Sequence, residues 1–218
     1  MNISSPFYAA SVLVLALTLA GCQAVQPYDY TNFRAHPPRS ILVLPPLNDS
    51  TAIEGTYGYL STVSRPLAEH GYYVFPVAVV DQFMKANGLP TAAEMHDAPL
   101  ARMAAVTGAD AVMFLELKQY DSKFVLLSSV TTVEVLAKLV DTRTGTLLWA
   151  GRGLAQQDSG SSGNPLASLI AAALSQVINK KTDRAHVVSR LANANLFDPD
   201  ATGLPYGPYS PKYDRAPH

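Results

Sequence analysis

Hydrophobic residues follow two different patterns along the chain, of which the first is a continuous apolar run. Residues Ser40–Leu44 read SILVL, which is typical of a strand buried on both faces. Along Ala111–Tyr120 and again along Thr131–Val140 apolar and polar residues alternate, which predicts antiparallel strands with one face in solvent. Asp141–Gly145 predicts a tight turn into a return strand at Thr146–Gly151.

Helical periodicity separates the first strand from the next. An apolar stripe over about residues Ile53–His70 predicts a helix, opened by a capping box at Thr51 and Glu54. Pro66 is expected to kink this helix or to restart it. Tyr72–Phe75 predicts a second strand, and the order strand, helix, strand implies a parallel, right-handed crossover.

Shorter helices fill the stretch before the alternating strands. Val77–Lys85 predicts one helix, and Thr91 with Glu94 forms a second capping box. A further helix is expected over Pro99–Thr107, with Asp97 as its cap.

The last part of the chain predicts a loop and then a long helix. Gly153–Asn164 is rich in glycine and serine and is expected to be a flexible loop. Pro165 opens a helix whose apolar stripe extends past a polar break at Asn179–Arg184. Core packing is the expected role of the stripe, and a homodimer interface is the alternative. The whole pattern predicts an α/β fold: a three-layer-like mixed sheet with a parallel β-α-β start, an antiparallel hairpin end and a long C-terminal helix.

The amino end carries a targeting signal. Ser11–Ala20 is an apolar run of about ten residues, the size of a signal-peptide core and too short to span a bilayer. Leu19, Ala20 and Gly21 precede Cys22 as in a bacterial lipobox, and we expect signal peptidase to recognise these three residues. A thiol is the nucleophile that can accept a diacylglyceryl group. We therefore expect Cys22 to carry a diacylglyceryl group and an N-acyl chain and to anchor the protein in a membrane.

Composition sets further limits. Cys22 is the only cysteine, so a lipidated chain has no thiol left for a disulfide. The formal net charge is −1 and basic residues are scattered, which argues against a nucleic-acid partner. The expected divisions are a signal peptide at 1–21, a tether at 22–39, a single α/β domain at 40–195 and a disordered tail rich in proline and tyrosine at 196–218.

No motif of catalysis or metal binding is present in the sequence. It contains no HExxH, Walker or GxGxxG pattern, and its histidines are scattered singly. The sequence therefore predicts a non-enzymatic protein without a metal site, whose lipid on Cys22 is its one attached group.

One loop has the position of a ligand site. Asn48, Asp49, Ser50 and Thr51 follow the first strand and precede a helix. Ligands of open α/β sheets bind at this edge, and free helix amides attract anions. The alternative, which we favour, is that these residues form a turn and a helix cap, because capping alone explains their residue types.

Four segments carry a resemblance to a known family. They are SILVLPP at 40–46, AEHGYYVFP at 68–76, GADAVMFLELKQY at 108–120 and LVDTRTGTLLW at 139–149. With the lipobox, they resemble a family of bacterial outer-membrane lipoproteins of unknown function, similar to the amino-terminal domain of TolB and to the periplasmic domain of curli-secretion channel lipoproteins. The resemblance implies a shared assembly with other envelope lipoproteins, including a curli-secretion-like subunit, and assigns a role to Cys22 alone.

The expected function follows from the anchor and the resemblance. We expect a lipid-anchored periplasmic binding or scaffold component of an outer-membrane assembly, because Gln23 stands where an aspartate would favour the inner membrane. The alternative is a ring-forming subunit of a curli-secretion-like outer-membrane channel, in which Ser122–Gly151 would form a membrane hairpin. A hydrolase with a site assembled from distant residues is a third alternative.

Overall fold

The computed structural model describes residues 28–125, 128–158, 181–198 and 202–213. Its strands are β1 (Ser40–Val43), β2 (Leu47–Asn48), β3 (Tyr73–Val74), β4 (Ala111–Val125), β5 (Ser128–Asp141) and β6 (Leu147–Asp158). Its helices are α2 (Thr31–Ala35), α3 (Gly55–Glu69), α4 (Val77–Ala86), α5 (Ala92–Asp97), α6 (Leu100–Thr107) and α8 (Lys181–Phe197).

The strands form one mixed sheet in the order β3-β1-β4-β5-β6, with β2 paired to β4. β1 runs parallel to β3 and β4, whereas β5 is antiparallel to both β4 and β6. This confirms the α/β fold with a parallel start and an antiparallel end. β1 alternates its side chains between two covered faces, which is why its sequence is apolar without a polar face.

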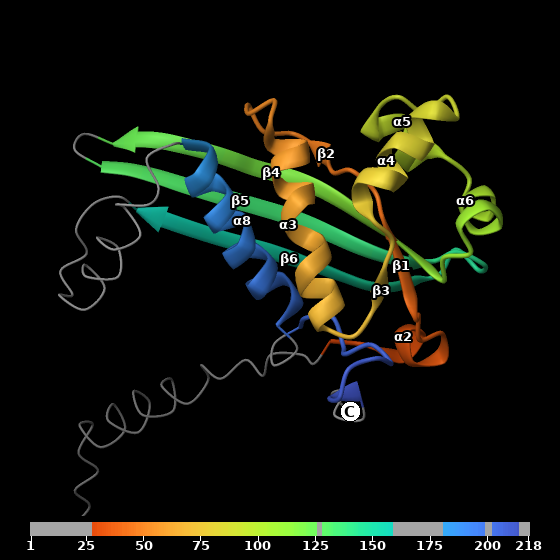
Figure 1. Ribbon diagram of the computed structural model, residues 1–218. Coiled ribbons are helices and arrows are strands. Elements are labelled where there is room, and N and C mark those ends of the chain that lie inside the picture. Colours follow the sequence, from red (N-terminus) through yellow and green to blue (C-terminus); the bar gives the residue numbers. More distant parts are fainter. Residues whose placement is uncertain (1–27, 126–127, 159–180, 199–201, 214–218) are drawn as a thin grey trace, which may run out of the picture.

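Helices cover both faces of the sheet at the β1 end, so the molecule has three layers there (Figure 1). Ile41 and Val43 pack with α3, while Leu42 and Leu44 pack with Val80, Met84, Met95 and Met103 from the α4–α6 side. Further along β4, β5 and β6, α3 and α8 lie across one face of the sheet (Figure 1). The fully buried Trp149 belongs to this second region of the core.

Several helix boundaries differ from the expectation. The capping box at Thr91 and Glu94 is confirmed, because each side chain bonds the other residue's amide. The expected box at Thr51 is wrong, since α3 begins at Gly55 after Glu54 without a side-chain cap. The expected restart at Pro66 is wrong as well, because α3 continues through it. Asp97 is the last residue of α5 and not the cap of α6.

The expected loop at Gly153–Asn164 is wrong in its first half, because β6 continues to Asp158. The remainder of that loop, and the beginning of the helix expected from Pro165, lie outside the described residues. The expected extension of a helix past the polar break is confirmed where it can be followed, since α8 is helical over Lys181–Phe197. Along α8, Val188 is buried as expected, whereas Leu191 is 48% exposed.

Both chain segments that flank the expected domain are part of the core. Tyr30 and Phe33, placed by the sequence in a tether, are buried; Tyr30 directly precedes α2, and Phe33 lies within it. Leu204, placed in a disordered tail, is fully buried. The tether and tail expectations are therefore wrong for residues 28–39 and 202–213, because aromatic and apolar side chains in both segments are buried in the core.

Candidate functional site

The expected ligand loop forms a turn that satisfies its own polar groups. The Asn48 side chain accepts bonds from the Ser50 amide at 3.0 Å and hydroxyl at 2.6 Å, and donates to the Ala52 carbonyl at 2.8 Å. Thr51 donates to the Asp121 carboxylate at 3.1 Å and caps no helix. These bonds favour the turn alternative for Asn48–Thr51 over a ligand site.

The loop is tied to the sheet by a cluster of charges. Lys118 on β4 lies 2.8 Å from the Asp49 carboxylate and also pairs with Glu116. The Lys118 ammonium group lowers the pKa of Asp49, and the Asp49 carboxylate in turn raises the pKa of Lys118. Because these groups are exposed, the pairs contribute little stability. Their effect is to hold the loop against β4.

A groove on the outer sheet face lies beside this cluster. Its walls are formed by Leu47, His96, Phe114, Leu115, Glu116, Leu136 and Lys138. The His96 Nε2 lies 2.9 Å from the Pro45 carbonyl oxygen, so Nε2 carries the hydrogen, and the ring meets Phe114 edge to face. Burial lowers the pKa of His96 even though that hydrogen bond opposes the shift, so the imidazole is neutral at pH 7. A neutral His96 ring that is hydrogen-bonded to Pro45 is suited to packing against Phe114.

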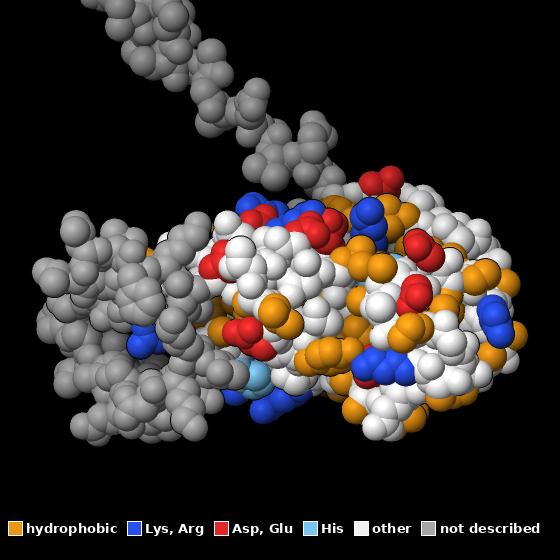
Figure 2. Space-filling view, turned by 90° about the horizontal axis from the view of Figure 1, so that it is seen from above, with side chains coloured by type: hydrophobic (Ala, Val, Ile, Leu, Met, Phe, Trp, Pro, Cys, Tyr) orange, Lys and Arg blue, Asp and Glu red, His pale blue; other side chains and the backbone are white. Residues whose placement is uncertain are grey.

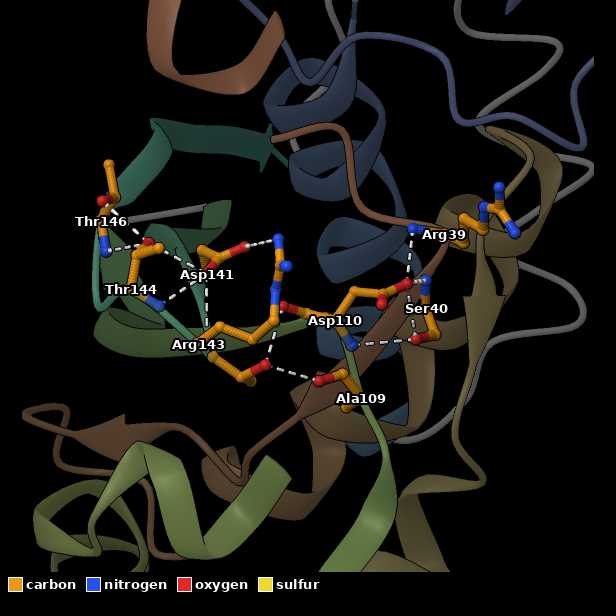
Figure 3. A network of polar contacts seen from close by, with 9 residues as sticks. Arg39, Ser40, Ala109, Asp110, Asp141, Arg143, Thr144 and Thr146 are labelled. Carbon is orange, nitrogen blue, oxygen red and sulfur yellow. Dashed lines mark hydrogen bonds and ion pairs between the residues drawn. The ribbon is translucent and has the colours of Figure 1, made fainter. Parts of the chain in front are cut away.

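The densest polar network lies where β1 and β4 begin and β5 ends (Figure 3). The Asp110 carboxylate accepts from the Arg39 amide at 2.9 Å and from the Ser40 amide at 3.1 Å. The Asp141 carboxylate accepts from the amides of Arg143 and Thr144 in the turn before β6. Burial raises the pKa of Asp141, but the bonds from Thr144 and Arg143 outweigh it and hold the pKa below its usual value.

The Asp141 carboxylate bonds amides and a hydroxyl of its own turn. The Asp110 carboxylate instead joins the start of β4 to the start of β1, because it bonds the Arg39 amide and the amide and hydroxyl of Ser40. Both are the pattern of a structural network. In addition, no three His, Cys, Asp or Glu side chains of the described part gather where they could hold a metal ion. Within the same ranges, no helix is long and apolar enough to cross a bilayer.

An apolar cleft between α4 and α6 is a surface that the sequence reading missed. Its walls are formed by Phe83, Met84, Asn87, Leu89, Ala98, Arg102, Met103, Val106 and Thr107, around a cavity of about 70 Å³. Phe83 is 40% exposed, Val106 54%, and Val79, one turn before Phe83, 61%. Figure 2 shows hydrophobic side chains gathered on the surface at the end of the molecule that holds these helices. The signal was present in the run VAVVDQF, which holds more apolar residues than one buried stripe requires.

The expected lipidation residue Cys22 and the recognition residues Leu19, Ala20 and Gly21 lie outside the described residues. Ser122–Gly151, which would form a membrane hairpin under the alternative channel hypothesis, falls within β4, β5 and β6. The inner face of these strands carries the buried Val133, Val135 and Leu139 in the core shared with α8.

Comparison with known proteins shows the family. Residues 28–209 match the family model described as "Putative lipoprotein GNA1162-like". This chain belongs to the GNA1162-like lipoprotein family. A Neisseria meningitidis lipoprotein, NMB1124/NMB1162, is 40% identical over 205 residues, covering 93% of this chain and 95% of the relative.

One solved structure agrees with this membership, and a second shows a weaker likeness. The crystal structure of lipoprotein GNA1162 from Neisseria meningitidis has 41% identity and a TM-score of 0.54, covering 66% of this chain and 100% of that chain. A PelC dodecamer from Paraburkholderia phytofirmans has 14% identity and a TM-score of 0.44, over 72% of this chain and 87% of that chain. The second likeness is too low to carry an argument about this chain. Membership of a lipoprotein family implies a membrane-anchored location in the cell envelope.

Proposed function

We propose that this GNA1162-like protein is a lipid-anchored, non-enzymatic binding or scaffold component of an outer-membrane assembly, with its folded part in the periplasm. Lipidation of Cys22 would supply the anchor, and Gln23 supports sorting to the outer membrane. The partner would be a protein, most simply a second envelope lipoprotein.

The observation that carries this proposal is the apolar cleft between α4 and α6. Val79, Phe83 and Val106 are large hydrophobic side chains in solvent, which marks an interaction surface when several lie together. Arg102 is the one charged residue that lines the cleft. The cleft therefore suits a protein segment that inserts an apolar side chain and presents an acidic group to Arg102.

Site-specific photo-crosslinking from native membranes tests the proposal. A photoreactive phenylalanine analogue at position 83 is expected to capture a discrete protein, whereas the same analogue at position 53 captures none. Ile53 is a suitable control because it is 93% exposed and lies outside the cleft.

Two substitutions sharpen the test. Phe83→Ser and Val106→Ser, which remove exposed side chains and leave the core intact, are each expected to abolish co-purification of that partner, while Ile53→Ser retains it. Co-purification that survives both cleft substitutions would contradict the assignment of the cleft. A large homo-oligomer without a companion protein would contradict the scaffold function itself.

A further inference from the structure

We propose that the end of the molecule formed by Tyr28 and residues 202–213 lies on the bilayer surface, with Tyr206, Tyr209, Lys212 and Tyr213 among the lipid headgroups. This inference rests on the lipidation of Cys22 put forward above. It specifies which face of the protein the anchor holds against the membrane.

The first step is the length of the tether. The Tyr28 hydroxyl accepts a bond from the Ala150 amide of β6 at 2.7 Å, and the buried Tyr30 donates to the Gly203 carbonyl at 2.7 Å. The chain is therefore fixed to the folded part from Tyr28 onward, six positions after Cys22. Six residues span at most about 22 Å when fully extended. A chain free up to Arg39 would have reached roughly three times as far.

The second step is the position of the carboxyl-terminal segment. It lies at the same end of the molecule as α2, on the side opposite α4 and α5 (Figure 1). Tyr28 is close to it, because the Tyr28 ring lies 4.7 Å from the ring of Tyr30, which bonds Gly203. Trp149 Nε1 donates to the Thr202 carbonyl at 3.0 Å, one residue before the Gly203 carbonyl that Tyr30 binds. Any tether of this length therefore brings residues 202–213 toward the bilayer together with Tyr28.

The third step is that the segment is fixed in place. The Gly207 amide donates to the His70 carbonyl at 2.8 Å, and the Tyr209 amide donates to the Gly71 carbonyl at 3.0 Å. The Tyr206 ring stacks on His70 with 5.1 Å between the ring centroids. Docking on a surface would thus cost little conformational entropy, because the backbone that carries the tyrosines is already held.

The fourth step is the chemistry of the exposed side chains. Tyr209 is 67% exposed and Tyr213 36%. Lys212 lies over the Tyr206 ring, with its Nζ 5.3 Å from the ring centroid. Residues 202–213 contain this lysine and no acidic residue. Tyrosine concentrates at membrane–water interfaces, and an ammonium group near the surface is attracted to lipid phosphates. The combination fits a lipid headgroup layer.

Lipid quenching of a placed tryptophan tests this orientation. The full chain, acylated and carrying Tyr209→Trp, is reconstituted into vesicles of phosphatidylglycerol and brominated phosphatidylcholine. The matched variant carries Ile53→Trp. Ile53 precedes the amino end of α3 and Gly71 follows its carboxyl end, so the two probes lie on opposite ends of a helix about 22 Å long. The native Trp149 is fully buried and gives both variants the same background.

The expected result is that brominated lipid removes most of the fluorescence added by Tyr209→Trp and leaves that of Ile53→Trp unchanged. Equal quenching of the two variants, or none of Tyr209→Trp, would overturn the orientation. Intact-mass measurement of the same samples separates the two proposals: a chain acylated on Cys22 but unquenched at position 209 contradicts the orientation alone. A chain without acyl groups on Cys22 contradicts the anchor, and the orientation with it.

Discussion

At the residue scale, Asp141 controls the turn between β5 and β6. Its side chain is 5% exposed and accepts bonds from two amides and the Thr144 hydroxyl. We expect Asp141→Ala to lower the free energy of unfolding by about 2 kcal/mol at pH 7, because it leaves these donors unpaired. Urea unfolding followed by circular dichroism measures the change. Arg143→Ala is the control and should cost almost nothing, since the Arg143 side chain is 72% exposed and its ion pair with Asp141 is 3.8 Å long.

The difference in unfolding free energy between wild type and Asp141→Ala should also depend on pH, which gives a second measurement of the role of Asp141. The pKa of Asp141 is lowered in the folded state, so its contribution is present above the unfolded pKa of about 4 and is lost as the pH falls through the folded value. The gap in unfolding free energy between wild type and Asp141→Ala should therefore shrink below about pH 4. A gap that stays constant down to pH 2 would show that the carboxylate charge does not matter.

Two similar motifs show what sequence reading could and could not predict at this scale. Thr91 and Glu94 form the expected capping box, because nothing else competes for either side chain. Thr51 and Glu54 have the same spacing, but Thr51 bonds Asp121, which lies on β4 seventy positions away. Local spacing predicts a cap only when no distant partner is within reach, and the sequence does not reveal such partners.

At the element scale, α3 and α8 are joined by a buried polar network. The Tyr59 hydroxyl donates to the Asn193 side-chain oxygen, and Asn193 Nδ2 donates to the Thr62 hydroxyl at 2.8 Å. Tyr59 is fully buried, and this burial raises its pKa far above the ordinary value, so the phenol is neutral and donates. Asn193→Leu is expected to cost about 2–3 kcal/mol, because it leaves the Tyr59 hydroxyl without an acceptor.

A double-mutant cycle checks that reason. Adding Tyr59→Phe to Asn193→Leu should restore part of the lost stability, since both partners are then apolar. The midpoint of urea unfolding of the four proteins gives the coupling energy. Strictly additive effects would mean that α3 and α8 are held by packing alone.

The attachment of residues 202–213 to the end of α3 depends on Gly71. Its φ is +88°, and a Cβ at this position would lie 2.2 Å from the Ser210 backbone nitrogen. Gly88 has a similar φ of +85°, and a Cβ there would have no neighbouring atom within 4 Å. Gly88→Ala is therefore the control that measures the cost of the backbone conformation alone, about 1 kcal/mol of unfolding free energy. Gly71→Ala should cost more and should expose residues 202–213 to limited proteolysis. Equal costs and an uncleaved segment would contradict this close approach.

Glycine also explains why part of β6 was predicted to be a loop. A Cβ on Gly153 would lie 2.5 Å from the Ala192 carbonyl oxygen of α8, so glycine is required where the helix crosses the strand closely. In the sequence, the same residue begins a stretch that contains GSSG at 160–163, and this composition indicates flexibility. The distinction depends on α8, which follows more than twenty residues later.

At the scale of the whole molecule, the layers were predictable and the boundaries were not. Continuous and alternating apolar runs distinguish β1 from β5, and that contrast alone predicts a mixed sheet. By contrast, Tyr30, Phe33 and Leu204 are isolated apolar residues among prolines and polar residues, without a period that would indicate burial. They pack into the core through tertiary contacts, which shortens the expected tether and brings the tail into the fold. The cleft between α4 and α6 was missed for a different reason: the run VAVVDQF shows an excess of apolar residues, but only the packed structure shows which of them remain outside.

The anchor is the last element that determines how the whole molecule is placed. Cys22→Ser removes the thiol that would accept the diacylglyceryl group, so we expect unprocessed precursor that takes up no radiolabelled palmitate. The matched control, Cys22 intact with Gln23→Asp, should still be acylated and should change only the membrane in which the protein is found. Stable attachment needs more than one acyl chain, and a Cys22→Ser protein carries none. We therefore also expect the partner to stop co-purifying with this protein from the outer-membrane fraction. Palmitate labelling that persists in Cys22→Ser would refute the anchor, and with it the arrangement that turns residues 202–213 toward the bilayer and the α4–α6 cleft away from it.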